Sequence, residues 1–204
     1  ITKIEGEGRV TGVVVSEVDP ATKKPISGTE KHFDCDTVLF SVGLIPENEL
    51  SVRAGIELSN ATKGAIVDNY RETCIEGVFA CGNVLQVHDL VDFVSEESEI
   101  AGKAAAEYVL NGKKQKDCIN CKVGDKITYV LPQKIDKNAD GDVNVYFRVN
   151  NTYKNVCVVV KDGDNVILEI KKRVVVPGEM ERVLLTSQKI KGITGDITVS
   201  IKEN

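Results

Sequence analysis

The second half of the chain alternates hydrophobic and polar residues at every second position. A polar turn, Asp162-Gly163-Asp164-Asn165, separates two of the alternating segments and is typical of a hairpin. Period-two alternation indicates half-buried strands, and several such strands at close spacing predict a small antiparallel β-sandwich of immunoglobulin-like type. The alternating segments are residues 143–149, 156–160, 166–170, 183–185 and 197–201.

The first half mixes strand and helix patterns. A valine-rich segment, residues 8–18, predicts a strand that pairs with the segments before and after it. Residues 37–42 are continuously apolar, which is typical of a parallel strand covered on both faces. We therefore expect an α/β arrangement here. The predicted strands are residues 1–4, 8–18, 29–34, 37–42, 65–67 and 77–81.

A single helix is predicted in the first half, at residues 95–110. Small and apolar residues recur there with helical spacing. Ser95, followed by Glu96 and Glu97, provides a polar and acidic start, which suits the positive end of a helix.

The patterns change at about residue 112. Residues 111–117 are polar, follow the predicted helix and show no periodicity, so we expect a domain boundary there. The lysines between residues 113 and 116 then belong to a solvated linker. The sequence predicts two domains, an α/β domain at residues 1–112 and an all-β domain at residues 113–204.

Composition and charge exclude several classes of protein. The chain is 42% hydrophobic and 28% charged, with a net charge of −5, which gives no electrostatic reason to expect nucleic acid. No run approaches about twenty apolar residues, and no leader pattern opens the chain, so we expect no membrane span and a cytoplasmic location. Because the six cysteines are scattered and a cytoplasmic location is expected, we predict that they are reduced thiols.

The most informative stretch is residues 73–83, Thr-Cys-Ile-Glu-Gly-Val-Phe-Ala-Cys-Gly-Asn. A short apolar strand ends there at Ala80, Cys81 and Gly82, and the missing side chain of Gly82 lets a ligand approach the backbone closely. Asn83 follows with a side chain that both accepts and donates hydrogen bonds. The stretch resembles the second FAD fingerprint of the pyridine-nucleotide-disulfide oxidoreductases, in which the position of Asn83 is usually Asp.

A second feature of this resemblance lies upstream. Residues 36–46 resemble the segment where the family's chain leaves its nicotinamide domain and re-enters the FAD domain. That segment ends Gly-x-x-Pro, which Gly43 and Pro46 match, although Ser41-Val42 replaces the usual Ala-Thr before the glycine. The resemblance implies that Gly43 and Pro46 belong to the cofactor site.

The predicted helix supplies the third feature. It resembles the family's helix whose amino end faces the flavin pyrimidine, where free N–H groups stabilise negative charge. The resemblance therefore implies that Val94, Ser95, Glu96 and Glu97 face the isoalloxazine. The small residues at 101–106 match the face that packs on the family's sheet.

The resemblance implies an oxidoreductase that passes hydride from NAD(P)H through FAD to an acceptor. Residues 1–35 correspond to the end of the nicotinamide domain and residues 36–112 to the end of the FAD domain. A full member carries two Gly-x-Gly-x-x-Gly turns, and this chain has none, since Gly6-Glu7-Gly8 lacks the third glycine. Together with Ile1 in place of Met, this favours a carboxy-terminal fragment of an NAD(FAD)-dependent dehydrogenase, inactive alone.

His88 is the candidate catalytic residue. It follows Asn83 closely and stands beside Asp89, and a histidine next to an acid can shuttle protons. The same pair equally suits a loop that satisfies a helix start.

Two further patterns suggest metal or redox chemistry. Cys118 and Cys121 have the spacing of a redox dithiol or half a zinc site, but the remaining zinc ligands are missing, and unpaired linker thiols are the simpler interpretation. Residues 136–142 match the first half of a calcium loop, yet Phe147 stands where the loop needs Glu, so a polar turn is favoured. We expect no metal.

A different class of function remains open. The β-domain has no predicted chemistry of its own, so the alternative is a module that binds a partner subunit or forms a homodimer. An exposed apolar patch on the sandwich would favour that alternative.

Overall fold

The computed structural model describes residues 1–41 and 43–203 of the chain. Contacts between Cα atoms divide the chain into two compact units, Ile1–Gly43 and Leu44–Asn204. Each unit is described on its own.

The first unit is a three-stranded antiparallel meander, with β1 (Lys3–Glu5), β2 (Gly12–Val15) and β3 (Lys31–Asp34). Val14 in the central strand lies opposite Lys3 on one side and His32 on the other. This confirms the three strands predicted at the start of the chain, although each is shorter than predicted. Among the hydrophobic side chains described in this unit, only Val13 is buried, so the meander has little core of its own.

The strand predicted at residues 37–42 is not observed. Residues 37–41 form no strand, Val42 lies outside the described residues, and Leu39 is 90% exposed. A buried parallel strand needs a hydrogen-bonded neighbour on each side, and no described segment pairs with residues 37–41. Residues 37–41 therefore lie outside any sheet, and all of them except Val38 are exposed.

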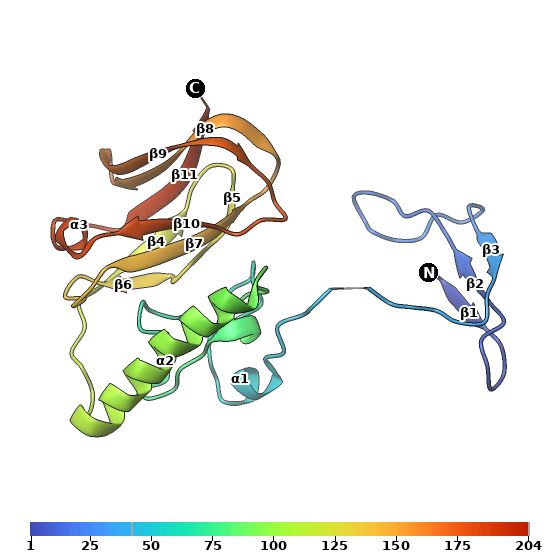
Figure 1. Ribbon diagram of the computed structural model, residues 1–204, viewed down its shortest axis with the longest axis horizontal. Helices are drawn as coiled ribbons and strands as arrows, with labels where there is room; N and C mark the ends of the chain where they lie inside the picture. Colours follow the sequence, from blue (N-terminus) through green and yellow to red (C-terminus); the bar gives the residue numbers. More distant parts are fainter. Residues whose placement is uncertain (42, 204) are drawn as a thin grey trace. The chain divides into compact units, whose positions relative to one another are not determined.

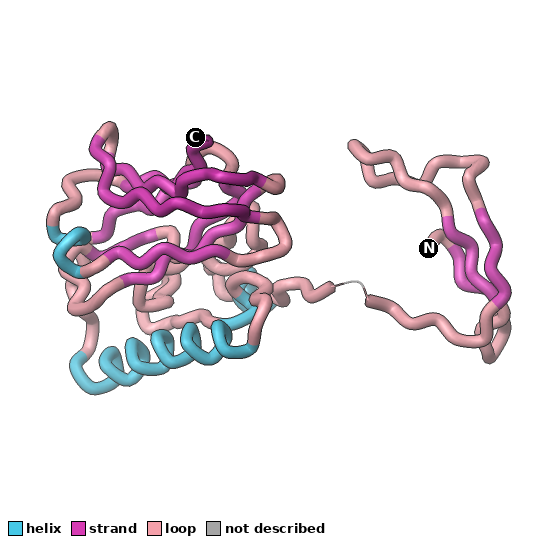
Figure 2. Tube along the Cα trace, turned by 45° about the horizontal axis from the view of Figure 1, so that its top comes forward, coloured by secondary structure: helices cyan, strands magenta, loops and turns pink. Residues whose placement is uncertain are grey.

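The second unit has three layers (Figures 1 and 2): a five-stranded sheet, a three-stranded sheet, and a layer of loops and helix. Its helices are α1 (Glu49–Arg53), the 3₁₀ turn η1 (Gly82–Val84), α2 (Val91–Asn111) and α3 (Ser187–Lys191). Its strands are β4 (Cys118–Val123), β5 (Ile127–Leu131), β6 (Lys134–Asp136), β7 (Val143–Val149), β8 (Tyr153–Asp162), β9 (Asn165–Val175), β10 (Glu181–Leu185) and β11 (Ile197–Glu203).

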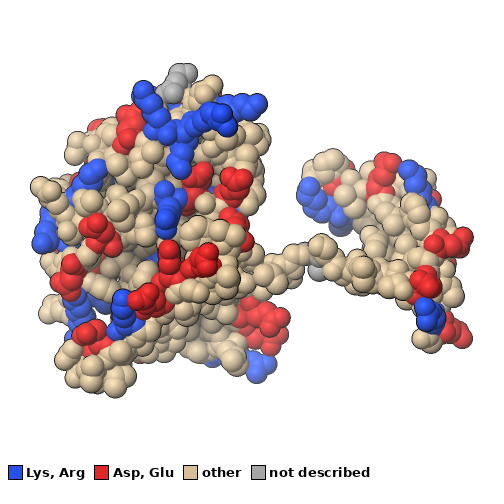
Figure 3. Space-filling view, viewed as in Figure 1, with Lys and Arg blue, Asp and Glu red and all other residues tan. Residues whose placement is uncertain are grey.

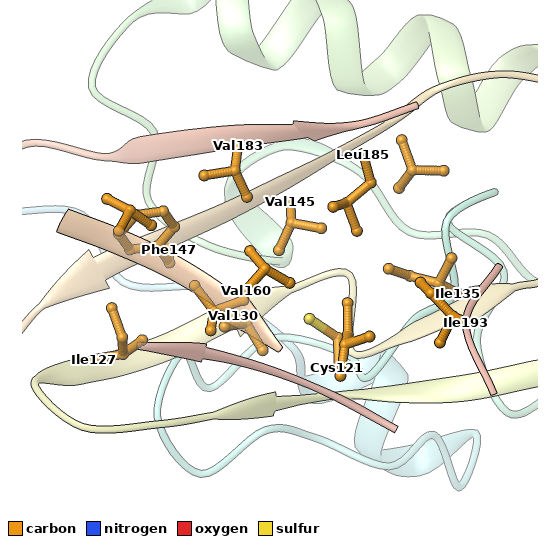
Figure 4. Packing of buried hydrophobic residues seen from close by; sticks show 14 of the residues in the cluster. Cys121, Ile127, Val130, Ile135, Val145, Phe147, Val160, Val183, Leu185 and Ile193 are labelled. Carbon is orange, nitrogen blue, oxygen red and sulfur yellow. The ribbon is translucent and has the colours of Figure 1, made fainter. Parts of the chain in front are cut away.

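The two sheets face each other across one hydrophobic core. The strand orders are β10-β7-β5 and β6-β4-β11-β8-β9. Figure 4 shows side chains from both sheets pointing toward one another, with Phe147 and Val183 from one sheet and Val160 and Cys121 from the other. The predicted hairpin at residues 162–165 is confirmed, because Asp162 pairs with Asn165. The purely antiparallel prediction was wrong, since β11 runs parallel to β4.

The outer face of the three-stranded sheet is covered by the segment before it in the sequence. A second core joins Leu131 and Tyr146 of the sheet to Val67 and Leu85 of the loops. In Figures 1 and 2, α2 lies along this side of the sandwich with loops in between. Residues 44–112 and the sandwich thus pack as one compact unit, and the domain boundary at residue 112 stays a prediction.

The short strands predicted at residues 65–67 and 77–81 are also not observed. They make only isolated bridges within the described residues, Leu58 with Ala65 and Glu72 with Phe79, and Gly77 lies in a turn. The local sequence pattern predicts a strand-like backbone, but a β-strand also needs a neighbouring strand of similar length to hydrogen-bond with. The predicted helix is confirmed, but it begins four residues earlier, at Val91.

The linker prediction for residues 113–116 was partly wrong. These residues form no regular structure, but their lysines are paired: Lys113 with Glu76, Lys114 with Asp140, and Lys116 with both Asp68 and Glu72. Lys116 is largely buried, so the segment is anchored to the fold at this residue, whereas Lys113 and Lys114 are exposed.

Basic side chains gather on the surface near the carboxyl terminus (Figure 3). Register places Lys202 and Lys171 on either side of Cys157 in the five-stranded sheet. Within the described residues, no helix is both long and apolar enough to cross a membrane.

Candidate functional site around Glu97

The candidate site begins with a tight turn at the end of the 73–83 stretch. Ala80 donates its backbone N–H to the carbonyl of Arg71, and the chain then turns at Gly82 into η1. Gly82 has φ of +73°, a left-handed conformation that favours glycine, and a Cβ built there would touch only Val94 at 3.4 Å. Backbone conformation, more than space, requires this glycine.

Glu97 of α2 is the centre of the site. Its side chain is 1% exposed, and its Oε1 accepts a hydrogen bond from Nε of Arg71 at 3.1 Å. Its Oε2 accepts the backbone N–H of Gly82 at 2.9 Å and lies 3.2 Å from Nε2 of His88. The carboxylate therefore joins the helix, the Gly82 turn and the loop that follows the turn.

His88 is held between Glu97 and Asn83. Its side chain is 2% exposed, and its Nδ1 lies 3.3 Å from Oδ1 of Asn83. The backbone N–H of His88 donates to the same Oδ1, which identifies that atom as the amide oxygen. Both ring nitrogens of His88 are thus occupied, and the amide nitrogen of Asn83 has no partner among the described residues.

Arg71 completes the buried cluster, and no pattern in the sequence pointed to it. Its side chain is 1% exposed, its Nη1 donates to the carbonyl of Asn69, and its φ is +68°. A buried guanidinium needs a paired anion, which Glu97 provides. A non-glycine residue with positive φ usually marks a local constraint, here the placement of the side chain against Glu97.

Asn48 and Gln86 were also missed. The side-chain nitrogen of Asn48 donates to the carbonyls of Lys63 and Val84, at 3.0 and 2.7 Å, and so ties the segment after Pro46 to η1. Gln86 follows η1, is buried, and has no partner for either amide atom. Neither residue type nor spacing distinguished these two from ordinary polar loop residues.

The remaining predicted site residues have varied positions. Ala80 and Cys81 are half-buried before the Gly82 turn, and Val94 lies beside Gly82. Pro46 is half-buried in the second unit, whereas Gly43, with φ of +82°, belongs to the first unit. The structure thus brings the 80–83 turn, His88 and Glu97 together.

Ser95 and Glu96 lie in the second turn of α2 rather than at its start. Ser95 donates its hydroxyl to the carbonyl of Val91, and Glu96 pairs with Arg182 of β10. The prediction that Ser95 begins the helix was wrong, because the cap position is Leu90, which makes no side-chain hydrogen bond. The first N–H groups of α2 are therefore left without a side-chain cap.

The Cys118 and Cys121 pair does not form a dithiol centre. Both lie in β4 rather than in the linker, and strand alternation exposes Cys118 while burying Cys121 on the opposite face. Partial desolvation of the Cys118 thiol and the nearby charges of Asp68 and Asp136 raise its pKa to about 11, although the residue is exposed at the surface of the sheet. Burial raises the pKa of Cys121 to about 12. A redox or zinc thiolate needs the opposite shift.

The carboxylates of residues 136–142 turn to separate partners. Asp136 accepts the backbone N–H groups of Asp117 and Asn138, Asp140 pairs with Lys114, and Asp142 accepts the N–H of Ser187. Across residues 1–41 and 43–203, no group of histidine, cysteine and acidic side chains is arranged to hold a metal ion.

Comparison with known families matches this part of the chain. The model of the pyridine nucleotide-disulphide oxidoreductases aligns with residues 7–107, which include the Gly82 turn, His88 and Glu97. Residues 7–107 are therefore similar to that family. The matched segment contains the whole buried cluster, and both sheets of the second unit lie outside the match.

Individual relatives align with about half of the chain or less. A thioredoxin reductase from Treponema pallidum is 27% identical over 107 residues, which are 52% of this chain and 32% of that protein. The ferredoxin reductase component of a chlorobenzene dioxygenase from Cupriavidus sp. (strain PS12) is 29% identical over 52% of this chain and 23% of its own length. A probable ferredoxin reductase from Castellaniella defragrans is 32% identical over 41% of this chain and 17% of its own length. The chain thus spans a third or less of each relative.

Proposed function

We propose that the chain provides the carboxy-terminal part of the FAD site in an oxidoreductase that passes hydride from NAD(P)H through FAD to an acceptor. The hydrogen bond from the Gly82 N–H to Glu97 carries the proposal. It joins the glycine of the flavin fingerprint to the helix that the resemblance places at the flavin. Two features fifteen residues apart in the sequence thus form one site.

The groups around Gly82 are compatible with bound FAD, which supplies a two-electron hydride carrier. The exposed Asn83 offers an unpartnered amide nitrogen, a donor suited to the ribityl or pyrophosphate oxygens. The uncapped start of α2, near Val94, offers backbone N–H groups to an anionic flavin edge. Ala80, Cys81, Gly43 and Pro46 keep the supporting roles that the resemblance implies, whereas Ser95, Glu96 and Glu97 already have protein partners.

Exposed apolar residues around α2 support the proposal that another part of a protein packs against this segment. Leu90 and Val91 at the start of the helix, and Val109 and Leu110 at its end, are all more than half exposed. Surfaces of this kind are usually covered by other parts of a protein. The amino-terminal half of the family's FAD domain is the covering that the proposal requires.

We also infer a domain organisation, with the ends of the nicotinamide and FAD domains at residues 1–35 and 36–112 and an immunoglobulin-like sandwich at residues 113–204. Two sheets around one core support this sandwich type. Exposed large hydrophobic residues of the sandwich are spread over β4, β9 and β10, so no observation favours the partner-binding or homodimer alternative. A cytoplasmic location stays a prediction.

Visible absorption of the purified protein tests the proposal. The 204-residue chain, incubated with FAD and desalted, is expected to retain none, because it lacks the Gly-x-Gly-x-x-Gly turn. Protein that also contains the family's amino-terminal half is expected to purify with one FAD per chain, which NAD(P)H bleaches under anaerobic conditions.

Matched glycine variants sharpen the test. Gly82→Val places a branched side chain at φ of +73° and is expected to abolish flavin retention in the longer protein. Gly102→Ala, at an exposed helix position with nothing within 4 Å, is the control and should retain flavin. A longer protein that neither contains nor takes up FAD would disprove the proposed function.

A further inference from the structure

Arg148 of β7 connects the sandwich to the loop that contains His88. Its Nη2 donates to the carbonyl of Val87 at 3.1 Å and pairs with Oδ1 of Asp89. On the sandwich side, its Nε donates to the hydroxyl of Tyr129 at 3.1 Å and its Nη1 to the carbonyl of Pro177 at 3.3 Å. The planar guanidinium thus uses its rigid fork to hold two loop residues against two sandwich residues.

The second oxygen of Asp89 is held as well. Oδ2 accepts the backbone N–H of Met180, in the connection before β10, at 2.6 Å. The Asp89 carboxylate is therefore bound at both oxygens by the sandwich. Two directed contacts fix its position more tightly than a single exposed ion pair does.

His88 lies between the two loop residues that Arg148 holds. The ring of His88 does not contact Arg148; its two nitrogens lie next to Asn83 and Glu97. The β-sheets therefore hold the residues on either side of His88, while the buried carboxylate of Glu97 in α2 contacts its ring. Charged or titratable groups near it are Glu97, Arg71, Asp89, Arg148 and Tyr129.

We propose that Arg148 and Asp89 form a clamp through which the sandwich positions His88, and through His88 the amide of Asn83. Arg148 is a positioning residue, since it contacts neither of those side chains. The inference rests on the proposed function only where it assigns the Asn83 amide to FAD; the clamp itself stands on the contacts of the chain alone. The sandwich then completes the flavin-side loop instead of acting as a separate module.

Orientation of Asn83 follows from this arrangement. Its oxygen accepts the backbone N–H of His88 and lies 3.3 Å from Nδ1 of the same residue, so its Nδ2 is left for a ligand. Releasing the loop frees the oxygen and lets the amide rotate. Loss of the clamp should therefore expose His88 and weaken FAD binding together.

Histidine C2-hydrogen exchange in the 204-residue chain tests the clamp without any flavin. The chain has two histidines, and the side chain of His32 is 48% exposed, whereas that of His88 is 2% exposed. In the unmodified chain, His32 is expected to exchange readily and His88 to be protected. Arg148→Met should accelerate the exchange of His88 by about tenfold or more, because the loop opens locally, and leave His32 unchanged.

Matched variants separate the clamp from general damage. Arg182→Gln removes the exposed pair with Glu96, another contact between the sandwich and α2, and should leave His88 protected. Arg148→Lys keeps the charge opposite Asp89 but loses the fork, so its effect should lie between the two. If Arg148→Met does not fold, Asp89→Asn provides the same test from the loop side.

The clamp would be overturned if folded Arg148→Met or Asp89→Asn protected His88 from hydrogen exchange as well as the unmodified chain does. In the longer protein, the same variants should weaken FAD binding about tenfold or more, as loss of an oriented donor does. If the longer protein binds no flavin but His88 exchange still depends on Arg148, the proposed function is refuted and the clamp is still supported.

Discussion

Arg71 and Glu97 form an ion pair with both side chains 1% exposed and Nε 3.1 Å from Oε1. Glu97 also receives the Gly82 N–H and contacts His88, so one buried carboxylate connects the turn, the loop and the helix. Burial of two charges is costly unless each keeps its partner. The site therefore depends on this pair remaining intact.

Breaking the pair should destabilise the second unit strongly. Arg71→Met leaves the Glu97 carboxylate buried without its cation, and we expect the free energy of unfolding to fall by about 3–5 kcal/mol. Urea denaturation followed by circular dichroism measures this. Glu99→Gln, which removes the exposed Glu99–Lys103 pair on the same helix, is the control and should change little. Equal losses in the two variants would contradict a structural role for the pair.

Replacing both partners should recover part of the loss. In the double variant Arg71→Met, Glu97→Gln, no buried charge is left unpaired, so its unfolding free energy should exceed that of Arg71→Met. Additive losses would show that the two side chains act independently.

The sandwich core should be sensitive to cavities. Phe147 is fully buried between the two sheets (Figure 4), so Phe147→Ala should lower the free energy of unfolding by about 3–5 kcal/mol. Leu184→Ala, at a half-exposed position of β10, serves as the control and is expected to cost far less. The same urea denaturation measures both variants, and similar losses would argue against the packing described.

Thiol reactivity should follow the raised pKa values of β4. With the pKa of Cys118 near 11, only about one thiol in a thousand is ionised at pH 8, because the pKa shift favours the protonated form. We expect slow alkylation by iodoacetamide despite exposure, with a rate that rises about tenfold per pH unit up to about pH 11.

Cys121 should react more slowly still, since it is buried and its pKa is about 12. Mass spectrometry after timed alkylation measures both sites, and alkylation in urea is the control in which both should react alike. A Cys118 rate that levels off below pH 9 would mean that its pKa is not raised.

The linker should act as an anchor. Lys116 lies between Asp68 and Glu72, and Lys116→Met leaves these two carboxylates close together without their cation. We expect a loss of about 1–3 kcal/mol in unfolding free energy and faster proteolysis at residues 113–117. Lys113→Gln, at an exposed pair with Glu76, is the control. If the Lys116 variant is cleaved at the unchanged rate, the prediction of a solvated linker at residues 113–116 would be supported instead.

The sequence by itself determined the features that depend on local pattern. Period-two alternation predicted the strands from Val143 onward and the hairpin after Asp162, because side-chain direction alternates along any strand. Helical spacing predicted α2, and the 73–83 stretch pointed to the family that the comparison then matched.

Only the tertiary structure decided which segments found partners. Residues 37–41 have a strand-like composition but no neighbour to pair with, and β11 joined β4 in parallel, a choice that register and packing make rather than local pattern. Arg71 and Arg148 carried no sequence signal, because a buried arginine is distinguished only by the carboxylate that the fold places beside it. Long-range contacts of this kind depend on distance in space, which residue type and spacing do not encode.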